Sequence, residues 1–84
     1  MTMNKETFYK VKEALMRIGL KQSTKNGKTG FVFPNFQNVV IALQGIGADF
    51  EMTGSMGQSI WSLNHDLIFI DLPKNGKDGF VRFE

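Results

Sequence analysis

The fold is decided by a nine-residue stretch, KNGKTGFVF at residues 25–33, which joins a tight turn to a strand. Asn26 and Gly27 form the turn, because Asn-Gly between two strands is the strongest short hairpin signal and both residues tolerate a positive φ. Residues 20–24 lead into the turn and residues 29–33 return from it. The stretch therefore predicts a β-hairpin, and with it an antiparallel sheet.

Nearly the same stretch returns as KNGKDGFVRF at residues 74–83. Two hairpins that arrived independently at a good turn, with lysines keeping the exposed tips in water, explain this echo. Alternatively, Lys25, Lys28, Lys74 and Lys77 form two matched tips that hold a phosphate backbone, because Lys and Arg make most such contacts. A duplicated half-domain is a third interpretation, although genuine repeat architectures need about three or more units.

Two helices are expected around the first hairpin. Residues 4–18 carry one apolar stripe at helical spacing, and Gly19 followed by an apolar residue has the form of a helix stop. Residues 36–44 repeat this pattern, with Gly45 as the expected stop. The β-branched run at residues 39–41 also suits a strand, so both interpretations of this second element stay open.

The segment after the second helix alternates between apolar and polar residues. Within residues 48–53, Ala48, Phe50 and Met52 face one way and the polar residues face the other. This period of two predicts a half-buried strand with Phe50 and Met52 turned toward the core.

Three further strands complete the predicted sheet. Residues 59–63 and 66–72 predict a second hairpin, and the run at residues 67–70 is apolar on both faces, which is typical of a central strand covered from both sides. Residues 79–83 form the last strand. The order α-ββ-α-ββββ predicts a single α+β domain over residues 1–84, with an antiparallel sheet of about five or six strands and two helices on one face.

The composition is that of one small globular domain. The 84 residues leave room for one domain, and 42% hydrophobic with 21% charged residues argue against disorder. There is no cysteine, which excludes a disulfide framework and thiolate ligation. The N-terminus lacks the layout of a signal peptide, and the longest apolar run, residues 39–43, is far shorter than the ~20 residues that span a bilayer. We expect a cytoplasmic protein that does not enter a membrane.

Residues that carry most enzyme chemistry are scarce. His65 is the one histidine, so a zinc site would need carboxylates almost alone, an unusual ligand set for zinc. Ser62, His65 and Asp66 lie close in sequence, but a catalytic triad is defined by converging geometry and not by adjacency. Asp49 and Glu51 share one strand face, where polar residues normally meet solvent. We therefore predict no catalytic residue, no metal site and no cofactor, and expect a protein that is not an enzyme.

Asp71 is a charge at the end of an otherwise apolar strand. By strand parity it shares a face with Leu67 and Phe69. Two arrangements suit it: an exposed strand end, or an ion pair with a basic residue such as Arg82 on the neighbouring strand.

Positive charge is concentrated early in the chain. Residues 1–30 carry seven basic and two acidic side chains, within a net charge of +2. Such asymmetry can mark a surface that binds a polyanion. The pairs Glu6–Lys10 and Glu13–Arg17 reduce the free positive field, and two arginines leave little capacity for bidentate reading of guanine. Nucleic-acid binding through the lysine tips is therefore expected to be weak, salt-sensitive and largely independent of sequence.

Candidate contacts with another protein come from large side chains outside the expected core. Tyr9 and Met16 share the helix face opposite the apolar stripe, and both residue types suit interfaces. Trp61 either packs in the core beside Leu63 or anchors an interface. Met56, in the preceding loop, is a lesser candidate.

The leading hypothesis is a small non-catalytic protein that binds another protein, as an inhibitor, an adaptor or an antitoxin-like regulator. A phage or mobile-element origin is a further hypothesis that no residue carries. The alternative function is nucleic-acid binding through Lys25, Lys28, Lys74 and Lys77. A homo-oligomer is also considered, because an exposed terminal strand can pair edge to edge with a second copy.

Overall fold

The computed structural model describes residues 4–83, apart from the side chains of Met56 and Phe83. The elements are α1 (Lys5–Arg17), β1 (Gln22–Lys25), β2 (Lys28–Phe33), α2 (Phe36–Gly45), β3 (Asp49–Thr53), the 3₁₀ turn η1 (Ser55–Gly57), β4 (Gln58–Leu63), β5 (Asp66–Asp71) and β6 (Gly79–Phe83). The predicted α+β class and the order α-ββ-α-ββββ are confirmed, and the second element is a helix.

Capping residues set the bounds of both helices. The side-chain oxygens of Asn4 and Asn35 each accept a hydrogen bond from the backbone N–H two residues on, at 2.8 and 2.9 Å. After α1, Gly19 takes the left-handed φ of 92° that its position predicts. After α2 the left-handed glycine is Gly47, at φ 88°, two residues beyond the expected stop at Gly45, which is the last residue of the helix. Neither helix described here is long and apolar enough to cross a membrane.

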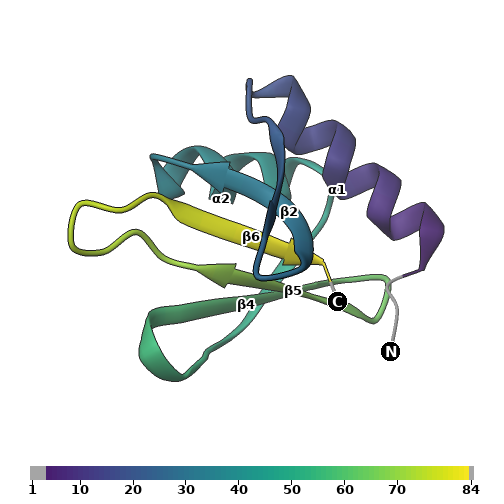
Figure 1. Cartoon of the computed structure of the whole chain (residues 1–84). Coiled ribbons are helices and arrows are strands. Elements are labelled where there is room, and N and C mark those ends of the chain that lie inside the picture. The colour runs from purple at the N-terminus through teal and green to yellow at the C-terminus, as the bar shows by residue number, and fades with distance from the viewer. Residues whose placement is uncertain (1–3, 84) are drawn as a thin grey trace.

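All six strands join in one antiparallel sheet, in the order β1-β2-β6-β5-β4-β3. The last strand, β6, lies in the middle of the sheet, between β2 and β5 (Figure 1). The expectation of an exposed terminal strand is therefore wrong. The edges of the sheet are β1 and β3 instead, because β6 fills the open side of the first hairpin.

Both helices pack on one face of the sheet and bury the core between them (Figure 1). The core side chains are Val11 and Leu15 of α1, Val39 and Leu43 of α2, Ala48 before β3, and Phe31, Phe33, Trp61, Leu63, Ile68, Ile70 and Val81 of the strands. Neither helix covers the opposite face, which is called the helix-free face below. Strand parity places Gly30, Val32, Gln58, Ile60, Leu67, Phe69, Asp71, Phe80 and Arg82 on this face.

Two expectations about strand burial are corrected. Phe50 and Met52 are 53% and 56% exposed, because β3 is an edge strand and an irregularity between these residues shifts its register with β4. The apolar run in β5 is covered on one face only. Ile68 and Ile70 are buried in the core, whereas Leu67 is 46% exposed on the helix-free face.

The two echoed stretches become neighbouring strands, since β2 and β6 pair in antiparallel register. On the core face the ring of Phe33 lies against Gly79, and on the helix-free face the ring of Phe80 lies against Gly30. A Cβ on either glycine would collide with that ring and with a backbone carbonyl oxygen. Each stretch therefore contributes a glycine whose missing side chain leaves room for a phenylalanine ring of the other stretch.

Candidate functional site

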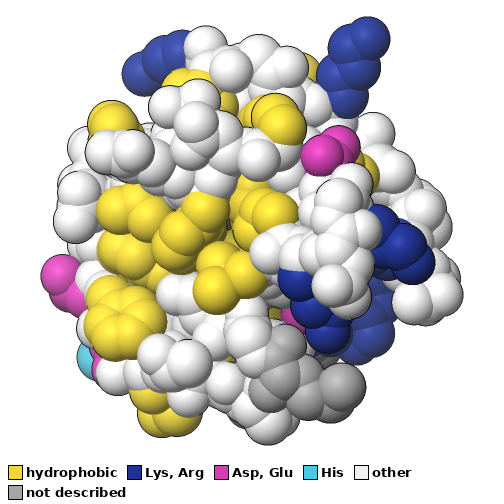
Figure 2. All heavy atoms as spheres, turned by 90° about the vertical axis from the view of Figure 1, so that its left-hand side faces the viewer, with side chains coloured by type: hydrophobic (Ala, Val, Ile, Leu, Met, Phe, Trp, Pro, Cys, Tyr) yellow, Lys and Arg dark blue, Asp and Glu magenta, His cyan; other side chains and the backbone are white. Residues whose placement is uncertain are grey.

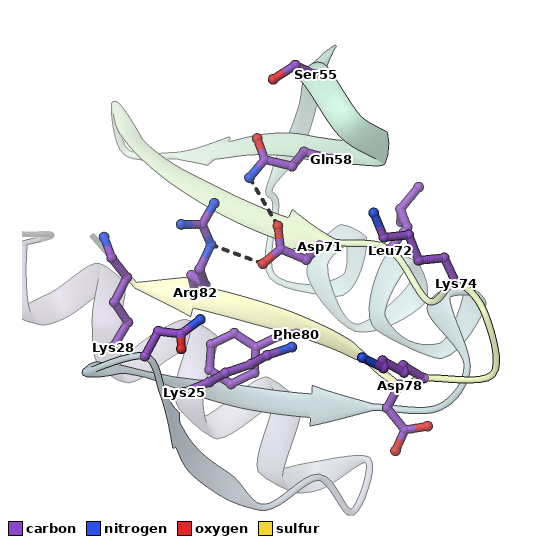
Figure 3. Close-up of a pocket in the computed structure, with 12 residues that line it drawn as sticks. Lys25, Lys28, Ser55, Gln58, Asp71, Leu72, Lys74, Asp78, Phe80 and Arg82 are labelled. Carbon is purple, nitrogen blue, oxygen red and sulfur yellow. Dashed lines mark hydrogen bonds and ion pairs between the residues drawn. The ribbon is translucent and has the colours of Figure 1, made fainter.

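A pocket of about 440 Å³ lies on the helix-free face, between the two lysine-bearing turns (Figure 3). The turn at residues 25–28, the turn at residues 74–78 and η1 form its rim, and β4, β5 and β6 contribute side chains to it. Five basic side chains line this pocket, which is called the basic pocket: Lys25, Lys28, Lys74, Lys77 and Arg82. The four lysines of the echoed turns are thus brought to one site.

Both turns have the backbone conformation that Asn-Gly predicts. Asn26 and Gly27 have φ values of 53° and 76°, and Asn75 and Gly76 have values of 52° and 75°. The first turn closes the β1–β2 ladder, whereas the second is closed by a single bridge between its flanking lysines. Each turn therefore holds its two lysines side by side across a hairpin tip.

The antiparallel pairing of β2 and β6 places the two turns at opposite ends of one strand pair. Each strand begins just after its own turn, so the tips lie apart along the strands and not next to each other (Figure 3). The path from one tip to the other follows β2 and then the residues that join the second turn to β6. At ~3.3 Å per residue, this path places the tips on the order of 20 Å apart. The basic pocket is therefore an elongated site with positive charge at both ends.

An aromatic ring forms part of the floor between the tips. Phe80 is buried against Gly30, and the Nζ of Lys25 lies 5.9 Å from the centroid of its ring. This cation–π contact turns Lys25 inward across the sheet, and Figure 3 shows its side chain running over Phe80.

Three polar side chains from three strands meet in the centre of the basic pocket. The Nε2 of Gln58 donates to the Oδ1 of Asp71 at 3.0 Å, and the Nε of Arg82 lies 3.2 Å from the Oδ2 of Asp71 (Figure 3). The Arg82 guanidinium also lies 5.7 Å from the ring centroid of Phe69. Of the two arrangements considered for Asp71, the ion pair with Arg82 is observed, and it holds a carboxylate among the basic side chains.

Gln58 and Phe80 are members of this site that sequence patterns do not identify, and Arg82 is expected from the sequence only as a partner for Asp71. The alternation within β6 places Phe80 and Arg82 on one strand face. Which face of the sheet that is depends on the register with β2 and β5, and this register is a property of the folded chain.

Basic charge exceeds acidic charge around the pocket. The lining residues include five basic side chains and two carboxylates, Asp71 and Asp78, and Asp71 is already engaged by Arg82. In the side view of Figure 2, several Lys and Arg side chains lie together beside a group of apolar side chains. A concave, basic surface beside apolar side chains suits an anion that also has apolar parts.

The candidate contacts with another protein are dispersed. Tyr9 and Met16 are both 53% exposed and line one shallow groove along α1. Trp61 is 5% exposed within the core, and its Nε1 donates to the Oγ of Ser59 at 2.9 Å, so its side chain is not at the surface. The side chain of Met56 lies outside the described part of the chain.

The remaining candidates for chemistry lie on the surface. His65 is exposed in the turn between β4 and β5, and Asp49 is exposed on the edge strand β3. The Oγ of Ser62 donates to the Oε2 of Glu51 at 2.6 Å. Among the residues that the structure describes, no group of three His, Cys, Asp or Glu side chains could hold a metal ion.

Comparisons with protein-family models, with curated proteins and with solved structures found no match. A fold of this kind does not by itself indicate a function. The functional proposal therefore depends on the residues and the geometry of the basic pocket.

Proposed function

We propose that the protein is a non-catalytic binding protein that holds nucleic acid on the helix-free face, with the four tip lysines on phosphates. One observation carries the proposal: two turns of the same sequence, far apart in the chain, line opposite ends of a single pocket. A small anion would meet one end of this site. A chain of phosphates reaches both ends, which are on the order of 20 Å apart.

The types of basic residue favour contacts with the phosphate backbone of the nucleic acid over recognition of its base sequence. The tips carry lysines, which are compact point charges, while the bidentate group at the site, Arg82, is engaged by Asp71. Phosphate contacts fix position and carry no sequence information. We therefore propose binding that is largely independent of sequence and strongly dependent on salt.

Fluorescence anisotropy with a labelled oligonucleotide, titrated from ~50 mM salt upward, tests this proposal. If each tip lysine neutralises one phosphate of a single strand, log Kobs falls against log salt with a slope of about −2.8, or about −0.7 per phosphate. Replacing the four tip lysines by Gln removes most of this slope and weakens binding at low salt.

The chain offers a matched control with the same loss of charge. Lys5, Lys10, Lys12 and Lys21 lie on α1 or just after it and do not line the basic pocket. A variant with these four lysines replaced by Gln should keep most of the slope of log Kobs against log salt. Equal losses in the two variants, or no binding to RNA or DNA at ~50 mM salt, would refute the proposal.

The exposed face of α1 supports a second proposal, the binding of another protein. Tyr9 and Met16 present half-exposed aromatic and thioether side chains along one groove, and both residue types are enriched at interfaces. Affinity purification from the host recovers a partner in stoichiometric amount with the unchanged protein, and Tyr9→Ala with Met16→Ala loses it. Purification of the unchanged protein alone, under gentle conditions, counts against this proposal.

A further inference from the structure

The centre of the basic pocket differs chemically from its two ends. We infer that the bound nucleic acid is single-stranded and that one base enters this pocket, where an exocyclic amino group of the base donates to the carboxylate of Asp71. The inference rests on the proposed function, which assigns the phosphates to the lysines at the ends. It adds the form of the ligand and a preference for bases that carry an amino group.

The shape of the site favours a single strand. The basic side chains surround a hollow, and Lys25 folds inward over Phe80 instead of projecting from its hairpin (Figure 3). Duplex DNA is read by a helix or ribbon that enters a groove, whereas concave basic grooves follow single strands. A pocket of about 440 Å³ has the size of a small-ligand site and admits a base but not a duplex.

Apolar side chains continue from the pocket across the helix-free face. Phe69 and Ile60 are partly exposed there, and Leu67 is 46% exposed. The Arg82 guanidinium lies over the Phe69 ring and presents a second flat surface. A chain of phosphates gains nothing from such groups. Unpaired bases stack on aromatic rings and guanidinium planes, and in a duplex these base faces are already covered.

Asp71 distinguishes the middle of the site from the ends. Its carboxylate repels a phosphate, so the ligand must present something other than phosphate there. An ionised carboxylate only accepts hydrogen bonds, and it pairs with the N4 amino group of cytosine. Gln58 and Arg82 each contact one oxygen of Asp71 and hold the carboxylate in place, and lone pairs remain for a ligand because its side chain is 40% exposed.

Deoxycytidine and deoxyuridine octamers test the inference, because they differ at position 4 of the base, amino against carbonyl. An octamer covers roughly 27 Å at ~3.4 Å per nucleotide, enough to reach both tips. We expect the unchanged protein to bind the cytidine octamer about fivefold more tightly by anisotropy, the size of one net hydrogen bond. Asp71→Asn reduces this ratio below about twofold, because an amide both donates and accepts.

Asp78→Asn is the matched control, since Asp78 also lines the pocket but takes no part in the contact between Gln58, Asp71 and Arg82. It removes the same charge, so it tightens binding of both octamers and leaves their ratio unchanged. Thermal unfolding of both variants checks that the fold is kept. Equal affinity of the unchanged protein for the two octamers, or binding of a duplex as tight as that of the single strands, overturns the inference. A lysine-dependent salt slope in that experiment still supports the proposed function, and no binding of any oligonucleotide overturns both.

Discussion

Strands β2 and β6 carry the same residues on opposite faces of one sheet. In β2, Phe31 faces the core and Val32 faces the helix-free side, whereas in β6 Phe80 faces the helix-free side and Val81 faces the core. The cause is the antiparallel register, which places Phe31 opposite Val81, and opposed residues share a face. A repeated sequence therefore repeats the turn without repeating the surroundings of the strand that follows it.

Because their side chains face opposite ways, the two stretches contribute to different parts of the molecule. The first directs two rings into the core, at Phe31 and Phe33, and contributes the buried centre of the domain. The second directs Phe80 and Arg82 to the open face and contributes to the basic pocket. The first stretch thus contributes mainly to the core, whereas the second contributes Val81 to the core and Arg82 to the basic pocket.

The largest expected effect is on stability, and it differs between Phe31 and Phe80, which occupy equivalent positions in the two stretches. Phe31→Ala should lower the free energy of unfolding by about 3–5 kcal/mol, because it leaves a cavity between the sheet and both helices. Phe80 is also buried, at 1% exposed, but Phe80→Ala should cost less, about 1.5–3 kcal/mol, because a single lysine side chain and not a helix covers the ring and can move into the space left. Urea unfolding measures both values. Equal losses would show that the cover over Phe80 relaxes no more than the helices over Phe31.

An intermediate effect is expected at the glycines that face these rings. Gly79→Ala and Gly30→Ala should each cost about 1–3 kcal/mol, because the added methyl group collides with the facing ring and with a backbone oxygen, that of Asp71 or Val81 respectively. Gly45→Ala is the control: nothing lies within 4 Å of its Cβ position, and within α2 alanine should stabilise the helix by about 0.5–1 kcal/mol.

Double variants make this prediction specific to each ring. At Gly79 the close neighbours include the end of the Phe33 side chain, so Phe33→Leu should recover part of the loss. At Gly30 the closest neighbour is the backbone oxygen of Val81, so Phe80→Leu should recover less. Similar recovery in the two pairs would contradict the assignment of ring to glycine.

Features that depend on neighbouring residues in sequence are predicted well. The Asn-Gly turns and the stop at Gly19 follow from local backbone preferences, and both are observed. The place of β6 in the middle of the sheet is not predictable in this way, because it results from pairing between residues as distant as Phe31 and Val81. Alternation along a strand is the same at an edge and in the middle, which is why the predicted burial of β3 was wrong.

The residues of the candidate site also divide into those that the local sequence predicts and those that depend on strand pairing. The four lysines are predictable because the echo marks them in the sequence. Gln58 and Phe80 join them through strand register alone, so the sequence contains no local sign of their role. The ion pair of Asp71 with Arg82 is the exception, since an isolated charge in an apolar strand requires a partner or a strand end.

The smallest expected effect concerns the turns, the feature that the two stretches share. Asn26 and Asn75 have nearly equal φ values, 53° and 52°, which alanine adopts at a cost of about 1 kcal/mol. Asn26→Ala should show this full cost, because the β1–β2 ladder continues up to the turn and prevents relaxation. Asn75→Ala should cost less, about 0.5 kcal/mol, because a single bridge closes its turn and the backbone can shift. Glycine at either position adopts the same φ without strain and serves as the control in urea unfolding. An equal loss at Asn75 would contradict this expectation, because the second turn would then be held as firmly as the first, and the two tips would be alike in rigidity as well as in sequence.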